Sequence, residues 1–279
     1  MMENYTNKIA LVTGASTGIG KESAIALAKK DYTVYAAARS VDKMQDLKEL
    51  DIIPIYLDLT QETSMLECVD TIFKKHSRID ILVNNAGYGS YGAIEDVSIA
   101  EAKRQYEVNI FGLARMIQLV LPKMRENNFG KIVNVASMGG RIWTLFGAWY
   151  HSTKFALEGL SACLRLELKG YNIDVIIIEP GGIETPFGII AAEHLIETSK
   201  GGVYEERAKK TAKGMKKIYS GKAFNKLTKP SVIGKCIAKA VSVRRPKTRY
   251  LLGSGSWFMT SFQRIFGDRI YDCFVLKMM

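Results

Sequence analysis

Short apolar segments alternate with longer amphipathic ones along the first two thirds of the chain. Runs rich in β-branched and apolar residues predict buried strands at 8–13, 33–38, 52–57, 79–84, 131–136 and 173–178. The segments between them have helical periodicity, with predicted helices at 23–30, 58–76, 101–126 and 150–168. The run at 173–178 is apolar throughout, which is typical of a central parallel strand covered on both faces. The alternation predicts an α/β fold of three layers, in which a doubly wound parallel sheet lies between helices.

The size of the chain favours a single large domain. Its 279 residues and 47% hydrophobic content can fill a sizeable core, and there is no internal repeat or low-complexity linker. No apolar run is long enough to cross a bilayer and no signal peptide precedes the first strand, so we expect a cytoplasmic protein. The scattered cysteines form no Cys-x-x-Cys pair and argue against a metal site or a disulfide framework; they are Cys68, Cys163, Cys236 and Cys273.

Positive charge is concentrated late in the chain. The formal net charge is +11, but residues 200–249 hold 16 Lys or Arg against two acids, so the rest of the chain is near neutral. A basic surface that faces only solvent would explain this segment. Contact with an anionic substrate tail, an acidic carrier protein or an acidic membrane surface would explain it equally well. Because the charge belongs to one segment and not to the predicted fold, we expect no nucleic-acid binding.

Three glycines follow the first predicted strand. Gly14, Gly18 and Gly20 stand between that strand and the next predicted helix. Glycines let backbone N–H groups approach a phosphate at the positive end of a helix dipole. The pattern predicts a dinucleotide-binding turn, and an ordinary tight turn is the alternative.

The second predicted strand ends at Arg39 and Ser40, 19 residues after Gly20. An acid at this place would bind the ribose 2′-hydroxyl of NAD, whereas the guanidinium of Arg39 suits the 2′-phosphate of NADP(H). A solvated loop arginine is the alternative. Asp58 and Leu59 end the third strand, where an adenine ring would lie.

Polar and small residues also follow the later strands. Residues 84–87 read Asn-Asn-Ala-Gly after the fourth strand, and Ser137 follows the fifth. Ligands of open α/β sheets bind at this carboxyl edge. Asn109 lies among apolar residues of the predicted helix, where an amide needs partners unless it is on the surface.

Tyr150 and Lys154 lie one helical turn apart, so both can approach one ligand, while His151 and Thr153 point elsewhere. Bringing a phenol from a pKa of about 10 to about 7 takes roughly 4 kcal/mol, which a lysine charge about 4 Å away supplies at a moderate dielectric. Chance alone predicts about one Tyr-x-x-x-Lys in this composition. The interpretation therefore depends on whether other segments bring a cofactor and a third catalytic group to this helix.

Together these motifs resemble the short-chain dehydrogenases/reductases, and the stretch 134–187 is most similar to their hydroxysteroid and retinol dehydrogenase branch. The matching motifs are T-G-x-x-x-G-I-G at 13–20, N-N-A-G at 84–87, Asn109, Ser137, Y-x-x-x-K at 150–154 and P-G at 180–181. The resemblance is close over roughly 6–187. It implies a Rossmann sheet of about seven strands, with 248–252 as the last one, and an NADP(H)-dependent oxidoreductase that forms dimers or tetramers.

The resemblance also implies a role for each matching residue. Tyr150 would donate a proton to a carbonyl oxygen that Ser137 orients. Lys154 would hold the nicotinamide ribose and lower the pKa of the phenol, and Asn109 would position a relay water. The implied cofactor contacts are Gly14, Ser16, Thr17, Gly18, Ile19, Gly20, Arg39, Ser40, Asp58, Leu59, Asn85, Ala86, Gly87, Tyr150, Lys154, Pro180, Gly181, Ile183 and Thr185.

The segments expected to select the substrate are apolar. We predict a lipophilic cleft lined by Tyr88, Tyr91, Met138, Trp143, Leu145, Phe146, Trp149 and Phe187. Residues 188–229 are expected to form a substrate lid, with one helical face made by Tyr204, Ala208, Ala212, Met215 and Tyr219. Residues 253–279 are expected to form an amphipathic extension that covers the site's mouth or a subunit interface, with a membrane surface as the alternative.

The leading hypothesis is an oxidoreductase that interconverts a hydroxyl and a carbonyl on a steroid-, retinoid- or long-chain-like substrate. One alternative is a β-ketoacyl-(acyl carrier protein) reductase, whose acidic carrier would suit the basic segment. The other is a non-catalytic nucleotide-binding protein of the same fold.

Overall fold

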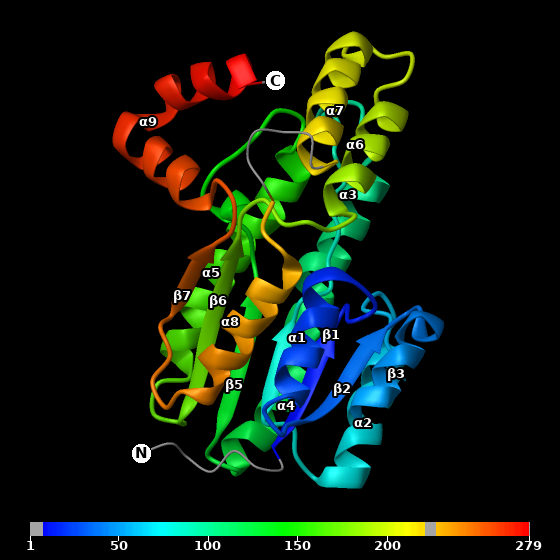
Figure 1. The fold of residues 1–279 in the computed structure, drawn as a ribbon, viewed down its shortest axis with the longest axis vertical. Helices are drawn as coiled ribbons and strands as arrows, with labels where there is room; N and C mark the ends of the chain where they lie inside the picture. Colours follow the sequence, from blue (N-terminus) through cyan, green and yellow to red (C-terminus); the bar gives the residue numbers. More distant parts are fainter. Residues whose placement is uncertain (1–7, 221–226, 279) are drawn as a thin grey trace.

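The computed structural model describes residues 8–220 and 227–278, and within them seven parallel strands form one sheet (Figure 1). Their order is β3-β2-β1-β4-β5-β6-β7, so the direction of winding reverses beside β1. The strands are β1 (Ile9–Thr13), β2 (Thr33–Ala38), β3 (Ile53–Tyr56), β4 (Ile81–Asn84), β5 (Gly130–Val135), β6 (Ile173–Pro180) and β7 (Arg249–Leu252). The predicted doubly wound sheet is confirmed, including its seventh strand near 248–252.

Helices cover both faces of this sheet. The helices of the described residues are α1 (Gly18–Ala28), η1 (Val41–Leu50), α2 (Glu62–His76), α3 (Ile99–Tyr106), η2 (Glu107–Gly112), α4 (Leu113–Glu126), η3 (Met138–Gly140), α5 (Ala148–Glu167), α6 (Phe187–Thr198), α7 (Glu205–Tyr219), α8 (Pro230–Ser242) and α9 (Ser256–Met278). Leu11 of β1 packs in the core shared with α2, α4 and α5, while its neighbour Val12 packs in the core shared with α1 and α8. Because successive strand residues face opposite sides, a strand buried on both faces is mainly apolar along its length, and the buried exceptions Lys131 and Asn134 of β5 have polar partners.

The predicted helix 101–126 is confirmed as one helical segment from Ile99 to Glu126, but its middle part is π-helical. A π-helical turn, η2, separates α3 from α4 and carries Asn109 on its buried side. At the end of this turn Gly112 approaches the chain after β3 so closely that a Cβ there would lie 2.5 Å from the Leu59 carbonyl oxygen. A π-helical turn holds one residue more than an α-helical turn. Here the extra residue accompanies the close contact with Leu59 and the inward-facing amide of Asn109.

Two helix starts also differ from prediction. The first helix starts at Gly18, inside the glycine turn, and not at 23; the helix of Tyr150 starts at Ala148. Both differences bring residues of the predicted site into a first helical turn.

Helices α6 and α7 pack on each other at the carboxyl end of the sheet (Figure 1). The predicted inner face of α7 is confirmed, since Ala208 and Ala212 are buried and Tyr204 and Met215 pack against the same cluster. Tyr219 lies on Gly188 of α6, where a Cβ would come within 2.2 Å of its ring. Part of the predicted lid, 221–226, lies outside the described residues.

Helix α9 projects from the body at the same end of the molecule (Figure 1). It bends at Gly267 (φ 70°, ψ −179°), and its second arm is anchored by Tyr271, which is fully buried and donates a hydrogen bond to the Trp143 carbonyl at 3.0 Å. On the first arm of α9, the side chains of Trp257 and Ile265 are 73% and 72% exposed. Among the described residues, none of the helices combines the length and apolarity needed to cross a membrane.

Candidate active site

The carboxyl ends of the strands carry the residues predicted to bind a cofactor. β1 runs into Gly14, β2 into Arg39, β4 into Asn85, and β6 ends at Pro180, so these segments lie along one edge of the sheet. Parallel strands place their carboxyl ends at the same edge, and the crevice at a reversal of winding is where such sheets bind ligands.

The glycine turn is too tightly packed for larger residues. Gly14 and Gly18 have left-handed φ values of +65° and +56°, which glycine adopts without strain. A Cβ at Gly20 would lie 2.3 Å from the Gly14 carbonyl oxygen and 2.5 Å from Nδ2 of Asn85. No side chain caps the first turn of α1 after Thr17. The turn thus presents the positive end of a helix dipole whose first backbone N–H groups have no side-chain cap, which fits a pyrophosphate.

Thr13 and Asn85 join the glycine turn to the loop after β4. The Thr13 hydroxyl accepts hydrogen bonds from the backbone N–H groups of Asn85 and Ala86, both at 3.0 Å. Nδ2 of Asn85 donates back to the carbonyls of Thr13 at 3.0 Å and Gly14 at 3.2 Å. The role of Thr13 was not predicted, although its position at the end of β1 beside β4 was a usable signal. Asn85 was predicted to contact the cofactor, and in the structure the amide nitrogen of its side chain is bonded to the turn.

Arg39 is exposed at the end of β2, on the side where the adenosine is expected. Burial and a hydrogen bond to Glu101 raise the pKa of the Tyr88 phenol, while the positive charges of Arg104 and Arg39 oppose this rise. Both guanidinium groups therefore lie within electrostatic range of Tyr88. Arg104, on α3, was not singled out from the sequence.

Asp58 and Leu59 take structural positions beside this region. The Asp58 carboxylate accepts hydrogen bonds from the N–H and hydroxyl groups of Thr60 at 2.9 and 2.8 Å. Leu59 is buried in the core. Ser40 is half-buried just before η1.

The loop after β6 touches the glycine turn. The methyl group of Thr185 would lie 3.1 Å from a Cβ at Gly18, and Ile183 is buried. Gly181 faces the Ser254 carbonyl oxygen, which a Cβ would approach to 2.4 Å. These contacts place the predicted nicotinamide-side residues next to the predicted pyrophosphate turn.

Tyr150 is buried, and its phenol is near enough to the Ser137 hydroxyl for the two groups to interact. Burial raises the pKa of the phenol to about 12, although the hydrogen bond with Ser137 lowers it in part. The lowering of this pKa by Lys154 stays a prediction for the site with its cofactor bound. The Lys154 ammonium lies 6.0 Å from the centroid of the Tyr150 ring and donates to the Val135 carbonyl at 3.0 Å. Burial also lowers the pKa of Lys154 to about 8, opposed by the charge of Glu158.

Asn109 is fully enclosed, so the alternative of a surface asparagine was wrong. Its Oδ1 accepts from the Tyr88 N–H at 3.1 Å, and its Nδ2 donates to the Tyr88 carbonyl at 3.0 Å and to Oγ1 of Thr153 at 3.1 Å. The amide links the loop after β4 to the helix of Tyr150. A Cβ at Gly87 would lie 3.0 Å from Oδ1 of Asn109 and 3.9 Å from Nζ of Lys154, so this loop passes directly over both groups.

Only part of the predicted apolar cleft surrounds Tyr150. The rings of Tyr91 and Phe187 lie 5.7 and 5.3 Å from the Tyr150 ring, centroid to centroid, and Leu145 and Phe146 belong to the same cluster. Met138 and Trp143 instead pack against α9, which corrects their assignment to the cleft. Tyr88, another predicted lining residue, donates to Oε1 of Glu101 at 3.0 Å. Trp149, also predicted to line the cleft, is half-buried.

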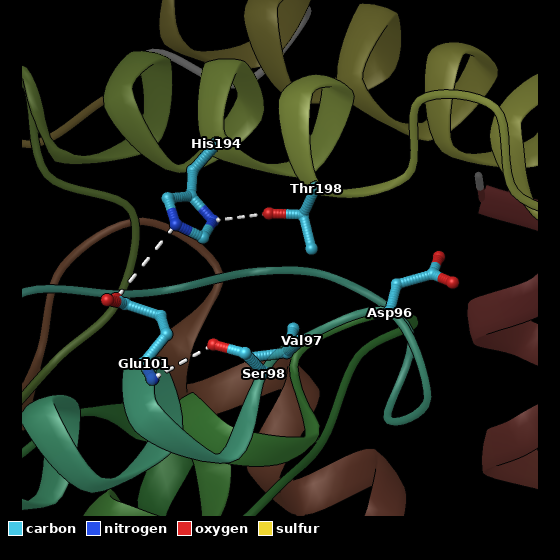
Figure 2. Close-up of a pocket in the computed structure, with 6 residues that line it drawn as sticks. All are labelled: Asp96, Val97, Ser98, Glu101, His194 and Thr198. Atoms are coloured by element: carbon cyan, nitrogen blue, oxygen red, sulfur yellow. Dashed lines mark hydrogen bonds and ion pairs between the residues drawn. The ribbon is translucent and has the colours of Figure 1, made fainter.

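A pocket of about 310 Å³ lies between α6 and the start of α3 (Figure 2). His194 hydrogen-bonds with Thr198 at 3.1 Å and lies 3.9 Å from Oε1 of Glu101, across the pocket. Neither Tyr150 nor a predicted cofactor contact lines it. In the part of the chain that the structure describes, no cluster of three or more His, Cys, Asp or Glu side chains is arranged to hold a metal ion.

Glu179, just before Pro180, is buried in a cluster of charges behind the site. Its Oε1 accepts from Nε of Arg141 at 2.8 Å and lies 3.3 Å from Nε of Arg249, which also binds Glu158. Burial and the nearby Glu158 raise the pKa of Glu179 to about 7, although Arg141 lowers it.

This pKa shift predicts that stability falls as the pH rises toward neutrality. Because the folded state holds the Glu179 proton more tightly, its stabilising effect is complete below about pH 4.5 and is lost as the pH passes about 7. The unfolding free energy of the wild type, relative to that of Glu179→Gln, should therefore decrease from pH 5 to pH 8 in urea titrations. Glu49→Gln, at an exposed site on η1, is the control. A constant difference between wild type and Glu179→Gln over this range would contradict the prediction.

Comparison with known proteins identifies relatives of nearly full length. A model of the short chain dehydrogenase family matches residues 8–194. The chain is 34% identical to a probable short-chain type dehydrogenase/reductase, VdlC, of Helicobacter pylori over 95% of both chains. It is 32% identical to the 3-ketodihydrosphingosine reductase of Bacteroides thetaiotaomicron over 88% of both chains. It is 34% identical to human retinol dehydrogenase 8 over 64% of this chain and 60% of that one.

The solved structures agree with this relationship. A serine dehydrogenase complexed with NADP+ superposes with a TM-score of 0.73 at 26% identity, covering 88% of this chain and 94% of that one. The predicted resemblance, including the likeness to retinol dehydrogenases, is confirmed. The chain therefore belongs to the short-chain dehydrogenase/reductase family.

Proposed function

We propose that the protein is an NADP(H)-dependent oxidoreductase that interconverts a hydroxyl and a carbonyl group on a lipophilic substrate. The observation that carries the proposal is the buried Tyr150, whose phenol interacts with Ser137 and which is followed one helical turn later by the buried Lys154. The glycine turn supports a dinucleotide, and the NADP+ complex of the related serine dehydrogenase supports NADP(H) in particular.

The side chains of the site divide the chemistry between them. A nicotinamide bound here supplies the hydride for the carbonyl carbon. Tyr150 donates the proton to the carbonyl oxygen, and a phenol with a raised pKa keeps that proton at neutral pH. Ser137 hydrogen-bonds the same oxygen as negative charge develops on it. Lys154 presents its ammonium to the nicotinamide ribose, and Asn109 fixes the loop of Gly87 above it.

The lipophilic substrate is supported by the surroundings of Tyr150. Tyr91, Phe146 and Phe187 make this side of the phenol aromatic, and α6 and α7 extend the cluster with small apolar residues. Two relatives are named for a sphingoid ketone and for retinol, which are both lipophilic. We therefore propose a steroid-, retinoid- or long-chain-like substrate, with residues 188–229 as its lid and the whole chain as one catalytic domain.

A panel of carbonyl substrates tests this proposal. Steroid, retinoid, long-chain and short ketones are offered with NADPH, whose absorbance reports turnover, beside a β-ketoacyl group on an acyl carrier protein. We expect the highest kcat/KM for a long apolar ketone or aldehyde. A preference for the carrier-bound substrate would favour the β-ketoacyl reductase, and NADPH binding without any turnover would favour the non-catalytic alternative.

Arg39 predicts the cofactor preference. Arg39→Ala removes a guanidinium from the end of β2, where only NADPH carries a 2′-phosphate. We expect the dissociation constant for NADPH to rise by about tenfold or more, as for the loss of one charge-assisted contact, and that for NADH to change little. Fluorescence titration of both cofactors measures this, with Arg165→Ala on α5 as the control. An equal loss of affinity for both cofactors would contradict the proposed preference for NADP(H).

The remaining partners are also proposals. On α7 the side chains of Arg207, Lys210, Lys213 and Lys217 are exposed, which supports contact with an anionic membrane or acidic protein. Vesicle sedimentation and carrier binding at low and high salt test this, and binding that is absent at low salt would contradict it. We propose a homo-oligomer located in the cytoplasm, to be tested by light scattering and cell fractionation.

A further inference from the structure

The residue after the catalytic tyrosine faces a loop that the reaction needs. His151 is buried in the first turn of α5, on a different side from the Tyr150 hydroxyl. It lies against residues 139–147, which connect Ser137 to the start of α5. The sequence suggested only that this side chain points away from the shared face of Tyr150 and Lys154.

Both ring nitrogens of His151 are bonded to this loop. Nδ1 lies 2.9 Å from the Gly139 carbonyl oxygen, which can only accept a hydrogen bond, so Nδ1 carries the proton. Nε2 lies 3.1 Å from the Thr144 N–H, which can only donate, so Nε2 carries none. The Thr144 hydroxyl also approaches Nε2, at 2.9 Å. The partners on both sides therefore define a neutral imidazole in its Nδ1–H form.

The loop is shaped closely around the ring. A Cβ at Gly139 would come within 2.9 Å of Nδ1, and one at Gly147 within 2.5 Å of Cδ2. The same Gly139 donates its N–H to Oγ of Ser137 at 3.0 Å. A short path of bonds therefore leads from the His151 ring through Gly139 to the Ser137 hydroxyl.

The groups facing the ring do not favour a charge on it. The Tyr91 and Tyr150 rings lie edge-on to it with centroids at 6.4 and 5.5 Å, and the loop contributes Gly139, Gly147 and Thr144. Burial lowers the pKa of His151, against the backbone hydrogen bonds of the loop, so the neutral form is retained. A proton on Nε2 would face the Thr144 N–H, and the two donors would repel each other.

We propose that neutral His151 is a positioning residue that holds the Ser137 loop against α5 and so keeps Ser137 in contact with Tyr150. The proposal rests on the oxidoreductase function proposed above. Protonation of His151 releases the loop at Thr144, moves Ser137 through Gly139, and lowers kcat without displacing the cofactor. The pH profile of the hydride-transfer rate consequently has an acid limb: the rate falls reversibly at low pH as His151 becomes protonated.

Substitution tests the proposal through the pH profile. In His151→Phe the ring volume remains but both hydrogen bonds are lost, and we expect kcat to fall about 10- to 100-fold, as for a small misplacement of a catalytic group. KM for NADPH should stay within about twofold, and the acid limb of kcat should disappear. His151→Gln, which can still bond part of the loop, should recover part of the rate. His76→Phe, at a histidine bonded to Tyr35 far from the loop, should keep both the rate and the acid limb.

A measurement without turnover guards against misfolding of these variants. In the wild type, ¹⁵N chemical shifts of the His151 ring should show a protonated Nδ1 and an unprotonated Nε2 from pH 6.5 to 9. The opposite tautomer, or a charged ring at pH 7.5, would overturn the proposal. A folded His151→Phe enzyme with the wild-type rate and acid limb would overturn it as well. Loss of activity in Tyr150→Phe, measured alongside, would show that the oxidoreductase function still stands. An active Tyr150→Phe would count against the proposed function instead.

Discussion

Tyr150→Phe is expected to lower kcat by about 10²- to 10⁴-fold, which is the usual contribution of a positioned general acid. The substitution removes one hydroxyl and keeps the ring, whose packing against Tyr91 and Phe187 supports the fold. The dissociation constant for NADPH should change by less than about threefold, because the glycine turn and Arg39 are untouched. Steady-state kinetics and fluorescence titration of one preparation measure both quantities.

Tyr91→Phe is the matched control for this change, since Tyr91 is a buried tyrosine in the same aromatic cluster. It should retain kcat within about tenfold. If Tyr91→Phe were inactive and Tyr150→Phe active, the proton donor would have been assigned to the wrong residue.

Gly20→Ala is expected to cause the second large effect. Its Cβ would lie 2.3 Å from the Gly14 carbonyl and 2.5 Å from Nδ2 of Asn85, so the turn or the bond from Asn85 must give way. Overpacking of this kind costs about 1–3 kcal/mol of stability. Because the displaced atoms form the proposed phosphate cradle, the dissociation constant for NADPH should rise about 100-fold, equivalent to about 2.7 kcal/mol.

Gly159→Ala is the control for Gly20→Ala, and it is expected to leave NADPH binding intact. Gly159 is exposed in α5, and a Cβ there would meet no atom within 4 Å. The replacement should stabilise the helix by about 0.5–1 kcal/mol and leave NADPH binding unchanged. Equal NADPH affinity in Gly20→Ala and wild type would contradict the placement of the phosphate at this turn.

Periodicity and residue order were enough to predict the sheet and its carboxyl edge. Strands buried on both faces are mainly apolar runs, and the glycine turn follows β1 directly, so both features are local in sequence. The π-helical turn between α3 and α4 is not local in this sense. It accompanies the contact of Gly112 with Leu59, which lies over fifty residues earlier.

The apolar cleft was predicted less well, because composition does not tell which element covers an aromatic residue. Trp143 packs against Tyr271 of α9, and this contact spans 128 residues. The burial that raises the pKa of Tyr150 was not predicted, for a similar reason. The helical spacing shows that Lys154 is near, but burial, which raises the pKa of the phenol, depends on α6 and α7 above it.

The His151 and Thr153 side chains show what spacing alone cannot show. Both are turned away from the proposed reaction face, yet His151 binds the loop of Ser137 and Thr153 binds Asn109. Their partners are set by loops whose course the sequence does not predict.

Isotope transfer tests the central claim most directly. NADPH that carries deuterium at both C4 positions of the nicotinamide is incubated with the protein and a long-chain ketone, and the product is analysed by mass spectrometry. We predict one deuterium on the new carbinol carbon with the wild type and at most a trace with Tyr150→Phe. Alcohol formed without deuterium, or equal labelling by both proteins, would contradict hydride transfer assisted by Tyr150.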